Sequence, residues 1–185
     1  STATTNVTDN ATATTVTLTA STASVAEGGS IIYTATASNV VQGTALVVTL
    51  ANGQTITIPT GSSSASSAAF TVRADDAYVQ GTGTVSTSIS TTSGGNFESI
   101  TKVGTPSTSV TDNSTATVVT LTASAGTVNE GGSIVYTATV NNPVTGSDLV
   151  ITLTNGQTIT IPSGSSTANS AAYAVRADDA YAQGS

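Results

Sequence analysis

An internal repeat constrains this chain more than any other feature. The segment Glu27–Ser30 returns as Glu130–Ser133, and Arg73–Tyr78 returns as Arg176–Tyr181, always 103 residues later and with no insertion. Of the 82 positions at which both copies exist, 56 carry the same residue. Self-similarity at a fixed period is the signature of repeated structural units. The chain is therefore predicted to be a tandem array of domains of about 100 residues each.

The repeat sets the expected domain boundaries. We expect one domain over residues 1–103, a connector over 104–113, and a second domain over 114–185. The second copy stops before the counterpart of Thr84–Val103, so it is predicted to be an incomplete domain whose missing strands leave a sheet open.

Within each copy, apolar residues alternate with polar ones, which is the pattern of half-buried β-strands. The segment T-T-V-T-L-T-A over 14–20 places Val16 and Leu18 on one face and threonines on the other. Glycine, asparagine and serine separate such segments, and Asn52-Gly53 suits a two-residue hairpin turn. Seven strands are predicted, at 14–20, 30–38, 45–50, 55–59, 65–73, 84–90 and 97–103.

Seven short antiparallel strands in about 100 residues indicate an all-β fold of tandem immunoglobulin-like sandwiches. The expected core is small and contains many alanines. Its larger members are predicted to be Val16, Leu18, Ile31, Tyr33, Leu46, Val48, Leu50, Ile56, Ile58, Phe70, Val72, Val85 and Ile89.

Composition excludes several classes of function. The chain has no Cys, Met, Trp or His, and 66 of its 185 residues are Ser or Thr. Without thiolate or imidazole groups, the common nucleophiles, bases and transition-metal ligands are missing, so we predict that the protein is not an enzyme. Its net charge of −7 argues against nucleic acid as a partner, and no apolar run is long enough for membrane insertion.

The acidic residues are restricted to loops. If successive strands run antiparallel, the loops that carry Glu27 and Asp75-Asp76 emerge at the same end of the first domain as the connector that carries Asp112. Four crowded carboxylates repel one another unless a multivalent cation lies between them, and oxygen ligands alone favour Ca²⁺. The predicted metal-binding residues are Glu27, Asp75, Asp76 and Asp112 at this end, Asp9 and Glu98 at the opposite end, and Glu130, Asp178 and Asp179 in the second copy.

A simpler interpretation of these acids stays open. Aspartate is common in loops because its side chain accepts a hydrogen bond from the backbone two residues later. Arg73 and Arg176 can also pair with neighbouring carboxylates. The sequence contains no EF-hand loop, so the calcium prediction depends on convergence of the loops rather than on a local motif.

The motifs together resemble a known family. The order V-T-D-N, T-V-T-L-T-A, E-G-G-S-I-x-Y-T-A, N-G-Q-T-I-T-I-P, A-D-D-A-Y and G-G-N-F-E is similar to the extender repeats of large bacterial biofilm adhesins exported by type I secretion, the LapA and RTX types, including those of a marine ice-binding adhesin. The resemblance implies calcium bound at domain junctions. It also implies an extracellular location on the bacterial cell surface, and a role as a stiff spacer in cell adhesion and biofilm formation.

The expected partners are neighbouring repeats of the same chain, other adhesin chains or surface polysaccharide. A second hypothesis stays open beside the spacer: the exposed Ser and Thr faces or the loops could form a binding module that directly contacts a glycan, a surface or a partner adhesin. An isolated repeat that binds cells or polysaccharide saturably would favour the binding module.

Overall fold

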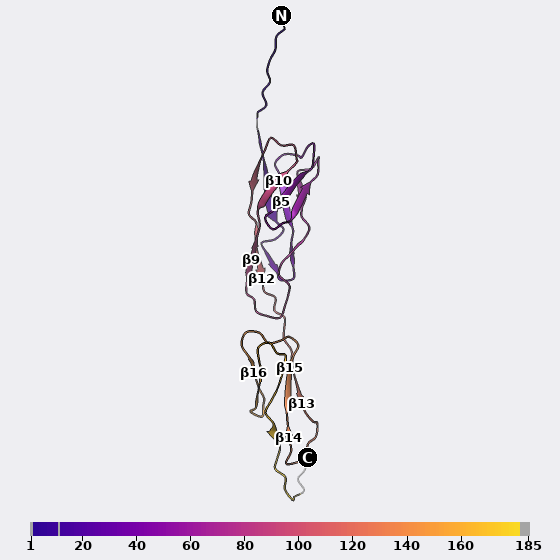
Figure 1. Cartoon of the computed structure of the whole chain (residues 1–185), viewed down its shortest axis with the longest axis vertical. Helices are drawn as coiled ribbons and strands as arrows, with labels where there is room; N and C mark the ends of the chain where they lie inside the picture. The colour runs from indigo at the N-terminus through magenta and orange to yellow at the C-terminus, as the bar shows by residue number, and fades with distance from the viewer. Residues whose placement is uncertain (1, 11, 182–185) are drawn as a thin grey trace. The chain divides into compact units, whose positions relative to one another are not determined.

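The computed structural model describes residues 2–10 and 12–181 of the chain. Every regular element in these residues is a β-strand, and the protein is all-β with an immunoglobulin-like sandwich arrangement. The chain divides into two compact units, which we call unit 1 (Ser1–Asn113) and unit 2 (Ser114–Ser185). Figure 1 shows the strands of both units.

Unit 1 contains twelve strands among its described residues. They are β1 (Ala13–Ala20), β2 (Ser24–Ala26), β3 (Ser30–Ile31), β4 (Tyr33–Ala37), β5 (Leu46–Leu50), β6 (Thr55–Ile58), β7 (Ser64–Ser66), β8 (Phe70–Thr71), β9 (Gly83–Ser86), β10 (Ile89–Ser93), β11 (Ser99–Val103) and β12 (Ser107–Thr111). Their pairing gives the orders β11-β1-β4-β7, β10-β5-β6, β2-β12-β9 and β3-β8.

The core of unit 1 lies between the first two of these sheets. Strand β1 buries Val16 and Leu18, β5 buries alternate residues, and Ile56 and Ile58 of β6 are fully buried. These are the residues that the alternating pattern predicts. All the predicted core residues are buried except Phe70 and Val85, which pack against the core while partly exposed. The sequence analysis missed Val41 and Val110.

Three predicted strands are each divided where the chain changes partner. The segment 30–38 splits at Ile32, and 65–73 splits between Ser66 and Phe70, because β4 pairs with β7 whereas β3 pairs with β8. The predicted strand at 84–90 becomes β9, which pairs with β12, and β10, which pairs with β5. In 30–38 and 84–90 the alternation continues through the change of partner and so does not reveal it, whereas in 65–73 the inward positions shift from Ala65 to Phe70 and Val72.

Strand β12 changes the interpretation of the segment 104–113. The sequence suggested a connector there, but residues 107–111 pair with both β2 and β9, and the whole segment belongs to unit 1. The pairing of β12 with β2 is parallel, as is that of β11 with β1. In Figure 1, β9 and β12 lie at one end of unit 1, away from β5 and β10.

Unit 2 repeats part of this arrangement. Its strands are β13 (Val119–Ala123), β14 (Ser133–Ile134), β15 (Tyr136–Val140), β16 (Leu149–Thr152), β17 (Thr158–Ile161), β18 (Thr167–Asn169) and β19 (Tyr173–Ala174). They pair as β13-β15-β18, β16-β17 and β14-β19. Within the described residues, these sheets match those of unit 1 without counterparts of β2 and of β9 to β12.

Candidate functional site: an acidic loop cluster in unit 1

Two acids meet because two parallel strands end together. In the register of β2 with β12, Ala26 lies opposite Thr111, so Glu27 and Asp112 both follow at the same end of this strand pair. The backbone N–H of Glu27 donates to the carbonyl oxygen of Thr111 at 3.0 Å. The structure therefore brings Glu27 beside the Asp112 segment through a strand that the sequence analysis did not predict.

Glu27 is held by fixed donors. Its side chain has no solvent exposure, and its Oε2 accepts from Arg73 Nε at 2.9 Å. Its Oε1 accepts from the backbone N–H of Asn113 at 3.1 Å. Arg73 also donates from a terminal guanidinium nitrogen to the carbonyl oxygen of Gly81 at 2.6 Å. Burying a carboxylate is tolerated when it is paired and hydrogen-bonded, and Glu27 meets both conditions.

The turn after Glu27 requires glycine. Gly28 has a φ of 74°, its N–H donates to the carbonyl oxygen of Arg73 at 2.8 Å, and a Cβ at Gly28 would lie 3.1 Å from the Cβ of Asp75. This close approach holds the Glu27 loop against the loop that carries Asp75 and Asp76. The E-G-G motif thus positions two acidic loops side by side.

Gln80 links the remaining two acids. Its backbone N–H donates to Asp112 Oδ2 at 3.0 Å, and its side-chain amide donates to Asp76 Oδ2. Asp76 Oδ1 accepts from the N–H of Tyr78 at 2.8 Å, which closes a turn over two residues. The other oxygen of Asp112, Oδ1, is buried without a hydrogen-bond partner in the described part of the chain.

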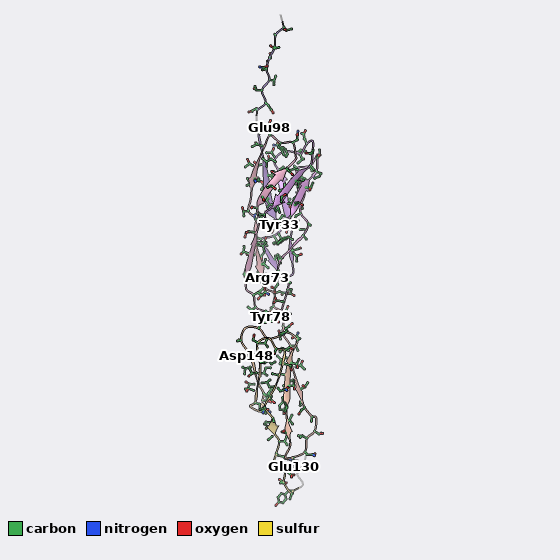
Figure 2. All side chains as sticks on the ribbon, viewed as in Figure 1. Tyr33, Arg73, Tyr78, Glu98, Glu130 and Asp148 are labelled. Carbon is green, nitrogen blue, oxygen red and sulfur yellow. The ribbon has the colours of Figure 1, made fainter. Side chains whose placement is uncertain are left out.

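We call Glu27, Asp75, Asp76, Gln80 and Asp112 the acidic loop cluster. Sequence reasoning missed Gln80, although the pair Gln80-Gly81 recurs as Gln183-Gly184 and so carries the signal of the repeat. In Figure 2, Arg73 and Glu98 are labelled towards opposite ends of unit 1, with Tyr33 between them. Glu98 is therefore separate from the acidic loop cluster.

The opposite end of unit 1 has different contacts. Glu98 is exposed and its Oε2 accepts from the N–H of Thr12, while Asp9 is exposed and accepts from the N–H of Asn10 at 3.0 Å. An open pocket of about 500 Å³ at this end is lined mainly by amide, hydroxyl and carboxylate side chains, among them those of Asn39 and Glu98.

Unit 2 carries a looser copy of the Glu27 loop. Arg176 Nε lies 3.3 Å from Glu130 Oε2, and the two side chains are 48% and 25% exposed. Asp179 Oδ1 accepts from the N–H of Tyr181 at 2.8 Å, as Asp76 does from Tyr78. Asp178 is exposed, although its Cβ lies close to Gly131. Glu27 contacts Thr111 at the end of β12 and Asn113 just after it. Among the described residues, no counterpart of this segment lies near Glu130.

The cluster offers oxygen ligands only. Backbone donors and Arg73 already occupy several of its carboxylate oxygens, and the described residues contain no group of three or more acids close enough to hold a metal ion ready-made. Asp76 accepts from the N–H two residues later, which matches the simpler interpretation that loop aspartates stabilise turns. The buried, unpartnered Oδ1 of Asp112 is the feature that a bound cation would satisfy, so the donor set fits a hard cation that takes carbonyl oxygens and water as further ligands.

Comparison with known proteins gives one family. The model of the LapA domain matches residues 12–113 and again residues 115–185. No curated protein matches the chain. In the described residues, no helix is long and apolar enough to cross a membrane.

Proposed function

This chain belongs to the LapA domain family, and on that premise we propose that its units are structural extenders of a bacterial cell-surface adhesin, rigidified by calcium. In this role the repeats hold adhesive modules away from the cell and support cell adhesion and biofilm formation. The proposed location is extracellular, and the proposed partners are neighbouring repeats. The absence of His and Cys from the sequence supports a structural role rather than catalysis.

The observation that carries the calcium proposal is the pair Asp112 and Asp76. The backbone N–H of Gln80 donates to Asp112 and its side-chain amide donates to Asp76, so the two carboxylates contact the same residue. Asp112 leaves a buried oxygen unpartnered, which costs free energy unless a cation or water satisfies it. We therefore assign Asp112 and Asp76 as calcium ligands.

Glu27 has a different role in this proposal. Its charge is already paired with that of Arg73, and its other oxygen accepts from the N–H of Asn113, so it positions the segment before Asp112 instead of binding the ion directly. Asp112 is the residue before Asn113, the last residue of unit 1, so a calcium ion there fixes the C-terminal end of unit 1.

The first test is chelation of the full chain. Extracellular calcium modules bind with a Kd of about 10⁻⁴–10⁻³ M, so calcium at about ten times the Kd stabilises the bound unit by about 1.4 kcal/mol. Removing calcium with EDTA is expected to lower the melting temperature and to change the distribution of end-to-end distances in X-ray scattering towards shorter values. If neither quantity changes, the calcium role is wrong.

A matched pair of variants locates the ion. Asp112→Asn is expected to weaken calcium binding, measured by titration calorimetry, by about tenfold or more, because one carboxylate charge is lost from the site. Asp9→Asn changes the same residue of the repeat at an exposed position at the opposite end of unit 1, and is expected to leave the affinity of the Asp112 site unchanged. Equal affinities for the two variants would refute the assignment of Asp112.

The polar pocket near Glu98 favours the second candidate function. Its amide and hydroxyl side chains are of the kind that bind sugars, so a glycan-binding module is the alternative to the spacer. Saturable binding of the chain to polysaccharide, abolished by Asn39→Ala but unaffected by chelation, would favour this alternative. The absence of binding leaves the spacer as the function of this chain.

A further inference from the structure

The first and last strands of unit 1 lie side by side and run in the same direction. Strand β1 pairs in parallel with β11, beginning with Ala13 opposite Ser99. Strand β2, which follows β1 in the chain, pairs in parallel with β12, which follows β11, and this pairing ends with Ala26 opposite Thr111. We call these four strands, with the short segments that join β1 to β2 and β11 to β12, the terminal strand pair.

Two carboxylates close the terminal strand pair, one at each end. Glu98, the residue before β11, accepts from the backbone N–H of Thr12, the residue before β1. Glu27, the residue after β2, accepts from the N–H of Asn113 at 3.1 Å, just after β12. Figure 2 labels Glu98 and Arg73, the ion-pair partner of Glu27, towards opposite ends of unit 1. Hydrogen bonds to a carboxylate are stronger than those between neutral groups, so these two contacts hold the ends of the pair.

Between these ends, both backbone and side chains join the two sides of the pair. The N–H of Ser109 donates to the carbonyl oxygen of Ala23 at 2.9 Å. The hydroxyl of Thr108, which is fully buried, donates to the carbonyl oxygen of Thr22 at 2.8 Å. The last strands of the unit are therefore attached to the first strands along both β1 and β2.

Tension along the chain acts on the two sides of this pair in opposite directions. The chain before β1 pulls on one end of the pair, and the chain after β12 pulls on the other end. Parallel strands pulled in this way separate only by sliding, so the evenly spaced hydrogen bonds between them are loaded together. Pulled from the same end, they would break one after another. Sliding by one residue would also turn the buried Val16 and Leu18 away from the core.

We propose that unit 1 is a load-bearing element, in which the terminal strand pair carries tension along the chain and Glu98 and Glu27 hold its two ends. This inference rests on the proposed spacer function for the origin of the tension, because a spacer transmits the pull between a cell and its point of attachment. It does not require calcium, since the proposed ligands Asp112 and Asp76 do not join the two sides of the pair.

The test is single-molecule force spectroscopy of the full chain. The sequence has no Cys, so two introduced cysteines define where the force is applied. Thr4→Cys with Ser114→Cys pulls the terminal strand pair from opposite ends. Thr4→Cys with Ser93→Cys pulls it from the same end, because exposed Ser93 ends β10 and the loop after it leads into β11.

At equal pulling speed, unit 1 is expected to unfold at a higher force in the first geometry than in the second, both with calcium and in EDTA. Equal forces in the two geometries, or a difference that is seen only with calcium, would overturn the inference. The calcium proposal is tested separately, by the effect of EDTA on the melting temperature, so either proposal can fail while the other holds.

A matched pair of buried threonines tests the path of the load. Thr108→Val removes the hydroxyl that joins the two sides, whereas Thr87→Val removes a buried hydroxyl that accepts from the N–H of Asn52 outside the pair. Pulled from opposite ends at constant force, Thr108→Val is expected to unfold about threefold faster or more, and Thr87→Val within about twofold of the parent rate. Melting curves check that both variants fold. Equal rates for the two variants would overturn the inference.

A second matched pair tests the end at Glu98. Glu98→Ala removes the acceptor for the N–H of Thr12, and Asp9→Ala removes an equal charge from an exposed position before the pair. Glu98→Ala is expected to unfold about threefold faster or more in the opposite-end geometry, while Asp9→Ala keeps the parent rate. An unchanged rate for Glu98→Ala, or equal changes for both variants, would refute the role assigned to Glu98.

Discussion

The buried pair Glu27–Arg73 allows a quantitative test, because the repeat contains an exposed copy of it. Glu27→Gln preserves the shape of the side chain but removes its charge and places either an uncharged oxygen or an amide N–H opposite Arg73 Nε. Breaking a buried ion pair costs about 3–5 kcal/mol. Since Arg73 is 27% exposed and water can partly solvate it, we expect a loss of about 2–3 kcal/mol of unfolding free energy in unit 1.

The equivalent substitution Glu130→Gln in unit 2 is the matched control. There the atoms are 3.3 Å apart and the side chains are 48% and 25% exposed, so the expected loss is about 0–1 kcal/mol. Because the unfolding entropy scales with size, each kcal/mol shifts the melting temperature by about 4 °C in unit 1 and by about 7 °C in the smaller unit 2, which predicts a decrease of about 8–12 °C for Glu27→Gln and at most about 7 °C for Glu130→Gln.

Differential scanning calorimetry of the full chain at low and high salt measures both shifts. The shift caused by Glu27→Gln is expected to vary little with salt, because a buried pair is poorly screened, whereas any effect of Glu130→Gln is expected to fall at high salt. Equal decreases for the two variants, or a Glu27→Gln decrease that disappears at high salt, would show that burial does not set the strength of this pair.

Two further substitutions test the core and a close backbone approach. Burial raises the pKa of Tyr33 above the ordinary tyrosine value of 10.0, and its hydroxyl is buried without a partner in the described residues, so the unfolded chain releases this proton first as the pH rises. This stability is present below pH 10 and is lost as the pH rises above it. Tyr33→Phe is expected to add about 1 kcal/mol and to reduce that alkaline loss in denaturant titrations, whereas Tyr136→Phe at the partly exposed counterpart is expected to leave the unfolding free energy at neutral pH unchanged. Gly104 has a φ of 99°, and a Cβ there would lie 2.4 Å from the carbonyl oxygen of Leu18, so Gly104→Ala is expected to cost about 3 kcal/mol or more. The control Gly53→Ala meets no atom within 4 Å and is expected to cost about 1 kcal/mol, and similar values for both would contradict the contact.

The alternation of apolar and polar residues was sufficient to predict the core strands of the sandwich, but it did not predict strand β12. Alternation places Val16, Leu18, Ile56 and Ile58 correctly because each strand buries one face whatever its partner. Strand β12 has a single large apolar residue, Val110, and is surrounded by Ser and Thr, so its sequence is indistinguishable from a loop. Its strand character comes from pairing with β2 and β9, and no local pattern encodes that pairing.

The candidate site, like the fold, could be predicted only in part from the sequence. The restriction of acids to loops, and the opposite position of Glu98, could be predicted from strand direction. The partner of Arg73 could not, because Asp75 and Asp76 are nearer in sequence, whereas Glu27 becomes its neighbour only when the E-G-G turn packs on the Arg73 loop. Gln80 was missed because an exposed loop glutamine has no distinctive local signal.

The parallel pairs β1–β11 and β2–β12 also determine when unit 1 can fold. Contacts such as that between Glu27 and Asn113 join residues 86 positions apart, so the first strands of the unit cannot acquire their final neighbours until the last have left the ribosome. Contacts of such long sequence separation slow folding, because the chain pays the entropy of a large loop before the contact stabilises it. In a tandem array whose copies are this similar, β1 of one unit could also pair with the equivalent strand of the following unit, and the order of synthesis reduces that competition because β11 of the same unit is made first.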